Sequence, residues 1–239
     1  MATGLTPLQL PLNISLREDA TFNNFYFPST SKNAEVVNAL QTQLASGNGA
    51  VVYLWGGSGS GITHLLQAAC HTVGAQSQTS VYLPLGELAG YAPTSLLEGL
   101  EQQVLVCLDD LQTIAGNPGW EETLFDLYNR VSEQRHNLFI GADCGPHQLL
   151  LTLPDLRSRL GAAFVYHVES LQDDDKLVAL QARASARGLH INNDVAQYIL
   201  NRSPRDTHKL FDVLEHLDEM SLSAQRKLTI PFVKQVLGW

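Results

Sequence analysis

Apolar residues gather in five short runs along the first two thirds of the chain. The runs cover residues 50–55, 79–84, 104–109, 137–142 and 163–168. They are rich in β-branched and aromatic residues, which is typical of buried strands. Helical patterning separates most of the runs, most clearly over residues 120–135. This alternation predicts an α/β fold with a five-stranded, mostly parallel sheet covered by helices on both faces.

The strand signal stops near residue 172, and the rest of the chain shows only helical patterning. Gly188 and the pair Ser203-Pro204 interrupt this patterning. The predicted helices span residues 172–187, 193–202, 205–222 and 230–237. We therefore predict an α/β base over residues 21–170 and a small all-helical lid over residues 171–239.

Composition narrows the classes of function. The 239 residues are 44% hydrophobic and 16% charged, which suits a globular protein with a large core. The formal net charge of -9 opposes a broad nucleic-acid-binding surface. Cys70, Cys107 and Cys144 form no C-x-x-C pair and are expected to be free thiols in a reducing cytosol. The sequence shows no signal peptide and no membrane span, so we expect a cytoplasmic protein without a membrane partner.

A glycine-rich loop follows the first predicted strand. Residues 56–63 read Gly-Gly-Ser-Gly-Ser-Gly-Ile-Thr, which fits the phosphate-binding pattern G-x-x-x-x-G-K-[S/T] except that Ile62 takes the lysine position. Backbone N–H groups of such a loop cradle phosphates, and the helix that starts near His64 adds its positive end. The loop is predicted to hold a nucleotide but to hydrolyse it poorly. An ordinary Gly/Ser loop is the alternative interpretation.

The third predicted strand ends in two carboxylates, Asp109 and Asp110. This is the form of a Walker B element, in which the first acid holds Mg²⁺ and the second orients the attacking water. Asp109 and the hydroxyl of Thr63 are therefore the candidate Mg²⁺ ligands. The pair of acids could also be only a turn or a helix cap. Together with the glycine-rich loop, it favours a nucleotide site.

Several segments of the chain, taken as a set, resemble the DnaA replication initiators, which belong to the AAA+ class of nucleotide-dependent switches. The resemblance covers nearly all of residues 20–238, and any one segment alone would be a weak signal. The segments are Thr21-Phe-Asn-Asn-Phe25, Gly61-Ile-Thr-His-Leu-Leu66, Leu108-Asp-Asp-Leu-Gln-Thr-Ile-Ala-Gly116, Asp155-Leu-Arg-Ser-Arg-Leu-Gly161 and Leu228-Thr-Ile-Pro-Phe-Val-Lys-Gln-Val-Leu237. The resemblance implies an AAA+ base followed by a helical lid.

The same resemblance implies roles for three further residues. Asp143, after the fourth strand, corresponds to a polar sensor near the γ-phosphate, and Arg205 corresponds to a second sensor that reaches the nucleotide from the lid. Arg159 corresponds to the arginine finger, a planar and permanent cation that acts on the nucleotide of a neighbouring subunit. The plainer alternatives are a loop aspartate and solvent-exposed arginines. The full predicted nucleotide-binding set is Gly56, Gly57, Ser58, Gly59, Ser60, Gly61, Ile62, Thr63, His64, Asp109, Asp110, Asp143 and Arg205.

Residues 1–20 are predicted to form a flexible tail, because prolines interrupt them and no periodicity builds up. The segment Gln9-Leu-Pro-Leu12 resembles the peptide by which replication proteins dock on the bacterial sliding clamp, the DNA polymerase III beta subunit. Gln9 would hydrogen-bond at the rim of the clamp pocket, and Leu10 and Leu12 would fill apolar pockets. The alternative is a tail whose leucines pack on its own body.

Two departures from the initiators narrow the prediction. Initiators carry a basic helix-turn-helix domain after the lid and a folded domain before the base, whereas this sequence has a short tail and ends at Trp239. The resemblance therefore implies a regulatory member of the group that holds ADP, docks on the clamp and contacts DNA only through it. Arg159 would stimulate hydrolysis of ATP bound to DnaA and so prevent re-initiation of chromosome replication. Self-association stays open.

Two other classes of function remain as alternatives. One is an autonomous ATPase of the helicase-loader type, which the isoleucine in place of the loop lysine opposes. The other is a DnaA-like DNA-binding protein, which the acidic net charge opposes. The sequence therefore favours a protein that activates hydrolysis in a partner over an enzyme with a turnover of its own.

Overall fold

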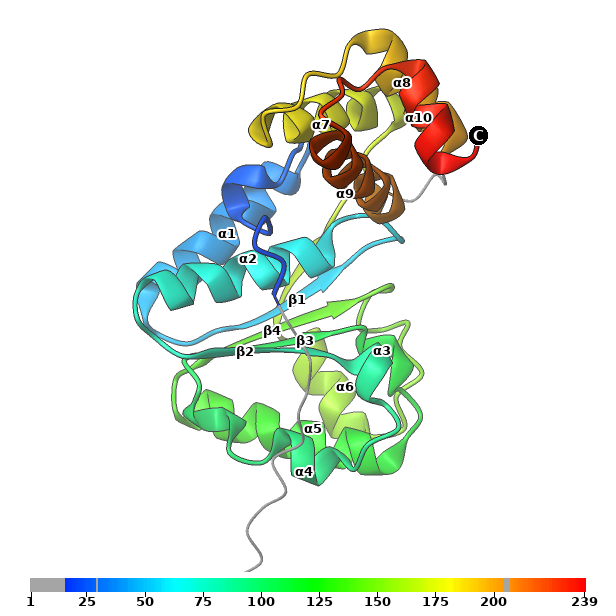
Figure 1. Cartoon of the computed structure of the whole chain (residues 1–239). Coiled ribbons are helices and arrows are strands. Elements are labelled where there is room, and N and C mark those ends of the chain that lie inside the picture. Colours follow the sequence, from blue (N-terminus) through cyan, green and yellow to red (C-terminus); the bar gives the residue numbers. More distant parts are fainter. Residues whose placement is uncertain (1–15, 29, 204–206) are drawn as a thin grey trace, which may run out of the picture.

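The computed structural model describes residues 16–28, 30–203 and 207–239 (Figure 1). Its centre is a five-stranded sheet in the order β2-β3-β4-β1-β5, and all neighbouring strands are parallel. The strands are β1 (Val51–Trp55), β2 (Ser80–Pro84), β3 (Leu105–Asp109), β4 (Asn137–Ala142) and β5 (Phe164–His167). The predicted fold class is confirmed, and each strand lies within one residue of its predicted run.

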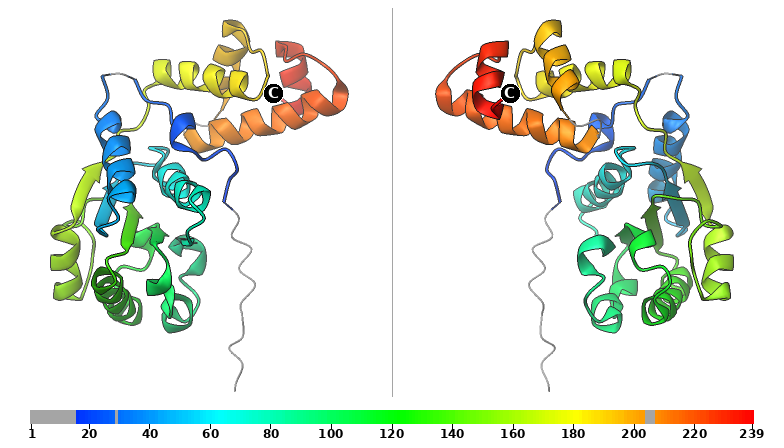
Figure 2. Two further views of the ribbon diagram at one scale, coloured as in Figure 1. Left: turned by 90° about the vertical axis from the view of Figure 1, so that its left-hand side faces the viewer. Right: turned by 90° about the vertical axis from the view of Figure 1, so that its right-hand side faces the viewer.

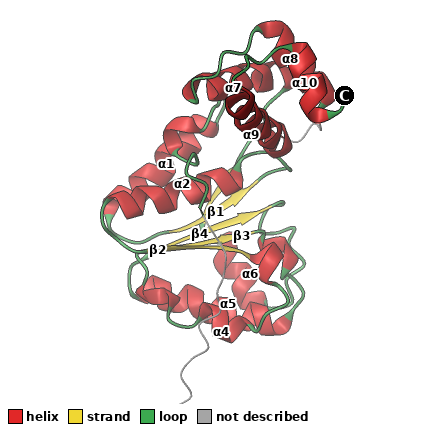
Figure 3. Cartoon of the chain, viewed as in Figure 1, coloured by secondary structure: helices red, strands yellow, loops and turns green. Residues whose placement is uncertain are grey.

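Helices cover both faces of the sheet (Figure 3). One face carries α1 (Asn33–Ser46) and α2 (Ile62–Ala75), and the other carries α3 (Leu85–Leu88), α4 (Pro93–Leu97), α5 (Pro118–Glu133) and α6 (Pro154–Gly161). Single-turn 3-10 helices lie at Phe22–Asn24 (η1), Leu100–Gln102 (η2) and Leu111–Thr113 (η3). Each face has its own buried apolar cluster, because the central strands are apolar on both sides.

Among the described residues beyond the sheet, four helices form the lid, which lies above the carboxyl edge of the strands (Figure 2). They are α7 (Asp173–Ala186), α8 (Asn193–Arg202), α9 (Thr207–Ala224) and α10 (Ile230–Leu237). Side chains cap two of them: Asn192 accepts from the N–H of Val195, and Thr229 accepts from the N–H of Phe232. A third apolar cluster, separate from those of the base, holds the lid together. The exact limits predicted for tail, base and lid stay predictions.

Residues 16–20 fall within the predicted tail, and in the structure they contact the base. Ala20 is 1% exposed, and the N–H of Arg17 donates to Oε1 of Gln67 on α2 at 3.0 Å. This segment is held by single contacts rather than by a repeating apolar face, so its sequence shows no periodicity. We call residues 16–28 the strap. Within the part of the chain that the structure describes, no helix has the length and apolar character needed to cross a membrane.

Candidate functional site

The glycine-rich loop, residues 56–61, leaves β1 and turns sharply into α2. Gly59 and Gly61 have positive φ angles of 75° and 93°, which glycine adopts without steric cost. A Cβ atom on Gly61 would lie 2.6 Å from Cε2 of Phe25 in the strap, and one on Gly59 would lie 2.8 Å from the backbone nitrogen of Thr207 in the lid. The loop is therefore enclosed between the strap and the lid, with no room for side chains at these two positions.

Ile62, at the position of the missing lysine, packs into the base. Its side chain is 8% exposed and belongs to the apolar cluster beneath α2. Its Cγ2 atom lies 2.6 Å from the point where a Cβ on Gly141 of β4 would stand, so the glycine makes room for it. Ile62 thus lines the floor of the loop with an apolar group where a phosphate-binding loop usually presents an ammonium.

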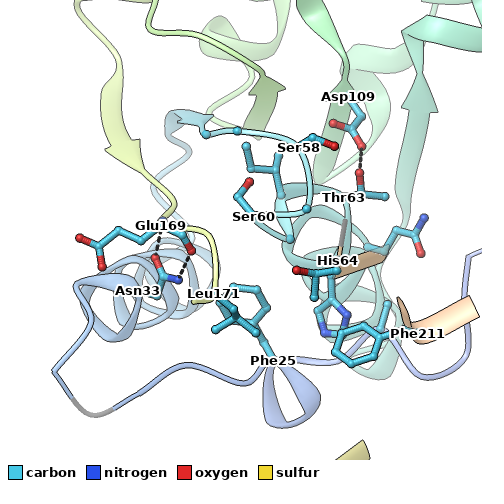
Figure 4. Close-up of a pocket in the computed structure, with 18 of the residues that line it drawn as sticks. Phe25, Asn33, Ser58, Ser60, Thr63, His64, Asp109, Glu169, Leu171 and Phe211 are labelled. Atoms are coloured by element: carbon cyan, nitrogen blue, oxygen red, sulfur yellow. Dashed lines mark hydrogen bonds between the residues drawn. The ribbon is translucent and has the colours of Figure 1, made fainter. Parts of the chain in front are cut away.

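Asp109 ends β3 directly beside the loop (Figure 4). Its Oδ2 accepts from the hydroxyl of Thr63 at 2.6 Å and from the hydroxyl of Tyr82 at 2.9 Å, and its Oδ1 accepts from the N–H of Asp110 at 3.0 Å. Burial to 4% exposure, with the negative charge of Asp110 beside it, raises the pKa of Asp109 above its usual value. A cation bound at Asp109 and Asp110 would offset the energetic cost of burying the Asp109 carboxylate.

Asp110 and Asp143 are joined through one side chain. Asp110 has a positive φ of 58° and accepts from Nε2 of Gln112 at 3.1 Å, while Oε1 of Gln112 accepts from the N–H of Asp143 at 3.1 Å. The carboxyl ends of β3 and β4 are thereby fixed side by side at the rim of the cavity. Sequence reasoning missed Gln112 and Tyr82, because neither residue type marks a site by itself.

His64 is partly buried against the strap. Its Nε2 donates to the backbone oxygen of Thr21 at 2.8 Å, and its ring lies 5.6 Å from that of Phe25. Burial lowers the pKa of His64 to about 4, so the ring is neutral at pH 7. A neutral donor here fixes the strap over the first turn of α2 and adds no charge to the cavity.

A cavity of about 500 Å³ unites these residues. Its lining comes from the loop, the strap, the carboxyl ends of β3 and β4, and the lid helices, which supply Arg183, Thr207 and Phe211. Among the predicted nucleotide-binding residues, those at positions 56–64 together with Asp109, Asp110 and Asp143 all line it. Arg205, Gln9, Leu10 and Leu12 lie outside the described residues, so their predicted roles stay predictions.

Charged side chains of the strap tie it to the lid. Asp19 pairs with Arg183 on α7 and, at 2.9 Å, with Arg187, the C-cap residue of α7. Arg17 in turn pairs with Asp212 and Glu215 of α9 at 3.4 and 3.5 Å. Because the strap also binds α2, it connects base and lid, and it forms part of the cavity lining. Burial alone would raise the pKa of Asp19, but the nearby arginines, led by Arg183, hold it below its usual value.

The connection from β5 to the lid is fixed by an asparagine. Asn33 is 1% exposed, and its amide bonds both backbone groups of Glu169, donating to the oxygen and accepting from the nitrogen at 2.9 Å each (Figure 4). This arrangement sets where the chain leaves the base before Leu171, another residue of the cavity lining.

The residues predicted to hold Mg²⁺ have the chemistry that this ion needs. The hydroxyl of Thr63 and the carboxylate of Asp109 present two oxygens at one point of the cavity, and Mg²⁺ is usually held by one or two protein oxygens together with phosphates and water. No cluster of three or more histidine, cysteine, aspartate or glutamate side chains able to hold a metal alone occurs among the described residues. The arrangement therefore fits an ion that arrives with a nucleotide.

The two arginines of α6 lie outside the cavity lining. Arg159 is exposed, and its guanidinium carbon lies 5.8 Å from the centre of the Tyr128 ring on α5. Arg157 donates from NH2 to the backbone oxygen of Leu151 at 2.7 Å. Arg157 is thus engaged in holding its own helix, whereas Arg159 presents a cation on the surface beside an aromatic ring.

Solved structures share this architecture. Domain III of the replication initiation protein DnaA from Thermotoga maritima is 19% identical with a TM-score of 0.76, and the match covers 94% of this chain and 98% of that one. AMPPCP-bound DnaA from Aquifex aeolicus is 20% identical with a TM-score of 0.69, covering 84% and 65%. The RuvB Holliday junction branch migration motor of Thermotoga maritima is 17% identical with a TM-score of 0.62, covering 88% and 69%. These likenesses establish the AAA+ fold of a phosphate-loop base with a helical lid.

A family model matches the lid. Residues 173–237 match the family model described as "Hda, lid domain". Together with the DnaA-like base, this match identifies the chain as an AAA+ protein related to Hda and DnaA.

Proposed function

We propose that this protein is a nucleotide-holding regulator that acts on ATP-bound DnaA while its tail docks on the sliding clamp of DNA polymerase III. The observation that carries the proposal is that the nucleotide cavity and the candidate arginine finger lie at two separate places on the chain. The chain's own cavity has Ile62 at the lysine position, whereas Arg159 stands exposed on a helix that does not line that cavity. A cation placed outwards in this way suits the nucleotide of another molecule.

The cavity supports the binding of ADP. Backbone N–H groups at residues 57–61 and the N-terminus of α2 would hold the α- and β-phosphates, and Thr63 with Asp109 would hold Mg²⁺. The structure of a DnaA bound to AMPPCP supports a nucleotide in a cavity of this fold. A γ-phosphate would meet Ile62 in place of an ammonium, so a diphosphate suits the loop at least as well as a triphosphate.

Arg159 would act on the ATP of DnaA. Its guanidinium is always charged and planar, and it would stabilise the negative charge that develops on the transferring phosphoryl group. The bound ATP and the attacking water would belong to DnaA, so the chain itself supplies no turnover. The result would be DnaA in its ADP form, which blocks re-initiation of replication.

The decisive experiment measures the ATP that remains on DnaA over time, with clamp loaded on DNA. Arg159→Ala should lower the stimulated rate by about 10³-fold or more, in line with arginine fingers supplied in trans. Arg157→Ala is the matched control from the same helix and should lose much less. If Arg159→Ala stimulates as well as the wild type, the chain acts as a passive adaptor and the proposal fails.

Docking on the clamp is tested separately. In a pull-down, the clamp should retain the wild type but not the double variant Gln9→Ala/Leu10→Ala. The control variant Glu18→Ala, in the adjoining strap, should be retained like the wild type. Equal retention of the wild type and the double variant would remove the clamp from the proposal. Basal hydrolysis in the pure protein would instead favour the autonomous ATPase.

A further inference from the structure

Glu121 is a buried carboxylate on the first turn of α5. Its side chain is 0% exposed and accepts from four donors: the N–H of Gly116 at 2.7 Å, the N–H and hydroxyl of Thr152 at 2.8 Å each, and the N–H of Leu153 at 2.7 Å. No lysine or arginine pairs with it within the described parts of the chain. Burial alone would raise its pKa, but these hydrogen bonds hold the pKa below its usual value, so the group stays ionised.

The donors to Glu121 belong to two segments that are far apart in the sequence. Gly116 ends the stretch that follows Asp109 and Asp110 through η3. Thr152 and Leu153 lead directly into α6, where Leu153 is the N-cap residue without a side-chain cap of its own. Glu121 therefore binds the N–H of the N-cap residue of α6 and connects the start of that helix to the segment that follows η3.

The other end of α6 is held by the same helix. Tyr128 lies seven residues after Glu121, two helical turns along the same face of α5. Its hydroxyl donates to the backbone oxygen of Arg159 at 3.5 Å, beneath the Arg159 guanidinium. Arg159 lies six residues after Leu153, or about 9 Å along the helix axis at 1.5 Å per residue. A tilt at the start of α6 would therefore displace the guanidinium.

We propose that Glu121 is a positioning residue for Arg159. Its charge fixes the start of α6, and through that helix it sets where the guanidinium meets the nucleotide of the partner. The inference rests on the proposed function of Arg159. Replacement of the carboxylate by an amide would place an NH₂ donor against N–H groups, and the start of α6 would lose its fixed direction.

Glu121→Gln should therefore lower the saturated rate of stimulated hydrolysis by about 10- to 100-fold, the scale of a 1 Å misplacement. The concentration of this protein at half-saturation should change less than twofold, because Arg159 acts in the transition state rather than in binding. The matched control is Glu122→Gln, which removes the exposed neighbouring carboxylate and should leave both values unchanged.

A double-mutant cycle separates positioning from a general loss of stability. In an Arg159→Ala background, Glu121→Gln should cause no further loss, because its route to the reaction is already gone. An equal fold-loss in both backgrounds would show that Glu121 acts on the whole fold, and the inference would be overturned.

Hydrogen exchange of the isolated protein tests the role of Glu121 without DnaA, and so separately from the proposed function. The amides of Thr152 and Leu153 should lose protection in Glu121→Gln and keep it in Glu122→Gln, whether or not DnaA responds. Unchanged protection in Glu121→Gln would overturn the inference. If wild type fails to stimulate DnaA at all, the proposed function fails, and the exchange result alone then decides whether Glu121 fixes α6.

Discussion

Asp19 is the residue by which the strap joins the lid, and its removal gives a sharp prediction. The carboxylate is 22% exposed and binds Arg183, which is 11% exposed, and Arg187, which is 22% exposed. Exposed ion pairs contribute about 0–1 kcal/mol, whereas removal of one partner from a buried pair costs about 3–5 kcal/mol. These partly buried pairs lie between the two cases, so Asp19→Ala should cost about 2 kcal/mol.

In a chain of this size, each kcal/mol shifts the Tm by roughly 2–4 °C, so Asp19→Ala should lower the Tm by about 4–8 °C. The same variant should weaken ADP binding by about tenfold, because the lid that it loosens supplies part of the cavity lining. Differential scanning fluorimetry and calorimetry would give both values. The control is Glu18→Ala, an exposed neighbour, which should shift the Tm by less than about 1 °C.

The pH dependence of the Asp19 effect has a definite sign. The folded-state pKa of Asp19 is depressed by its arginines, so the stabilisation is present above the unfolded pKa of about 3.9 and is lost as the pH falls through the folded pKa. The difference in Tm between wild type and Asp19→Asn should therefore shrink in acid. If Asp19→Ala melts and binds ADP like Glu18→Ala, the strap does not hold the lid.

Three further predictions follow from the site and the tail. Calorimetry should show that ADP binds at least as tightly as ATP, because Ile62 offers the γ-phosphate no cation; a tenfold preference for ATP would contradict this. Deletion of residues 1–15 should abolish clamp binding in a pull-down while cooperative unfolding persists, and clamp affinity equal to that of the full chain would refute it. Asp109→Asn should raise the Tm of the nucleotide-free protein at pH 7, because burial raises the pKa of Asp109 and its ionised form therefore destabilises the folded state. It should also weaken Mg²⁺-dependent nucleotide binding, and a lower Tm would show that the hydrogen bonds of Thr63 and Tyr82 outweigh the burial.

The sheet could be predicted from the sequence because its central strands β3, β4 and β1 are largely apolar runs that are mostly buried on both faces. The edge strand β5 is largely exposed, but its aromatic and β-branched residues still gave a strand signal. The loop and Asp109 were also visible, since phosphate binding fixes residue types at fixed spacings. Roles assigned by resemblance, such as those of Asp143 and Arg159, stay predictions, although the structure places the first at the cavity and the second outside it.

Other parts of the site depend on contacts that no local pattern carries. Arg183 reads as an ordinary cation in the last turn of a helix, yet it meets Asp19 from 164 residues away. Glu121 stands beside an identical residue, and nothing in the pair tells which one is buried. In the sequence, Tyr82 looks like any aromatic residue of a strand, although its hydroxyl donates a hydrogen bond to Asp109. Such contacts appear only once the sheet order and the position of the lid are known.

The crowding around Gly59 and Gly61 bears on what a surviving motif can tell about activity. Their hydrogens face a lid amide and a strap ring, so a side chain at either position would push the protein's own parts apart even with no phosphate present. A protein that does not hydrolyse nucleotide can lack the loop lysine, but internal packing would still require glycine at positions 59 and 61. The glycines of such a loop can therefore be required by the packing of strap, base and lid. Their presence does not indicate that the protein hydrolyses a nucleotide.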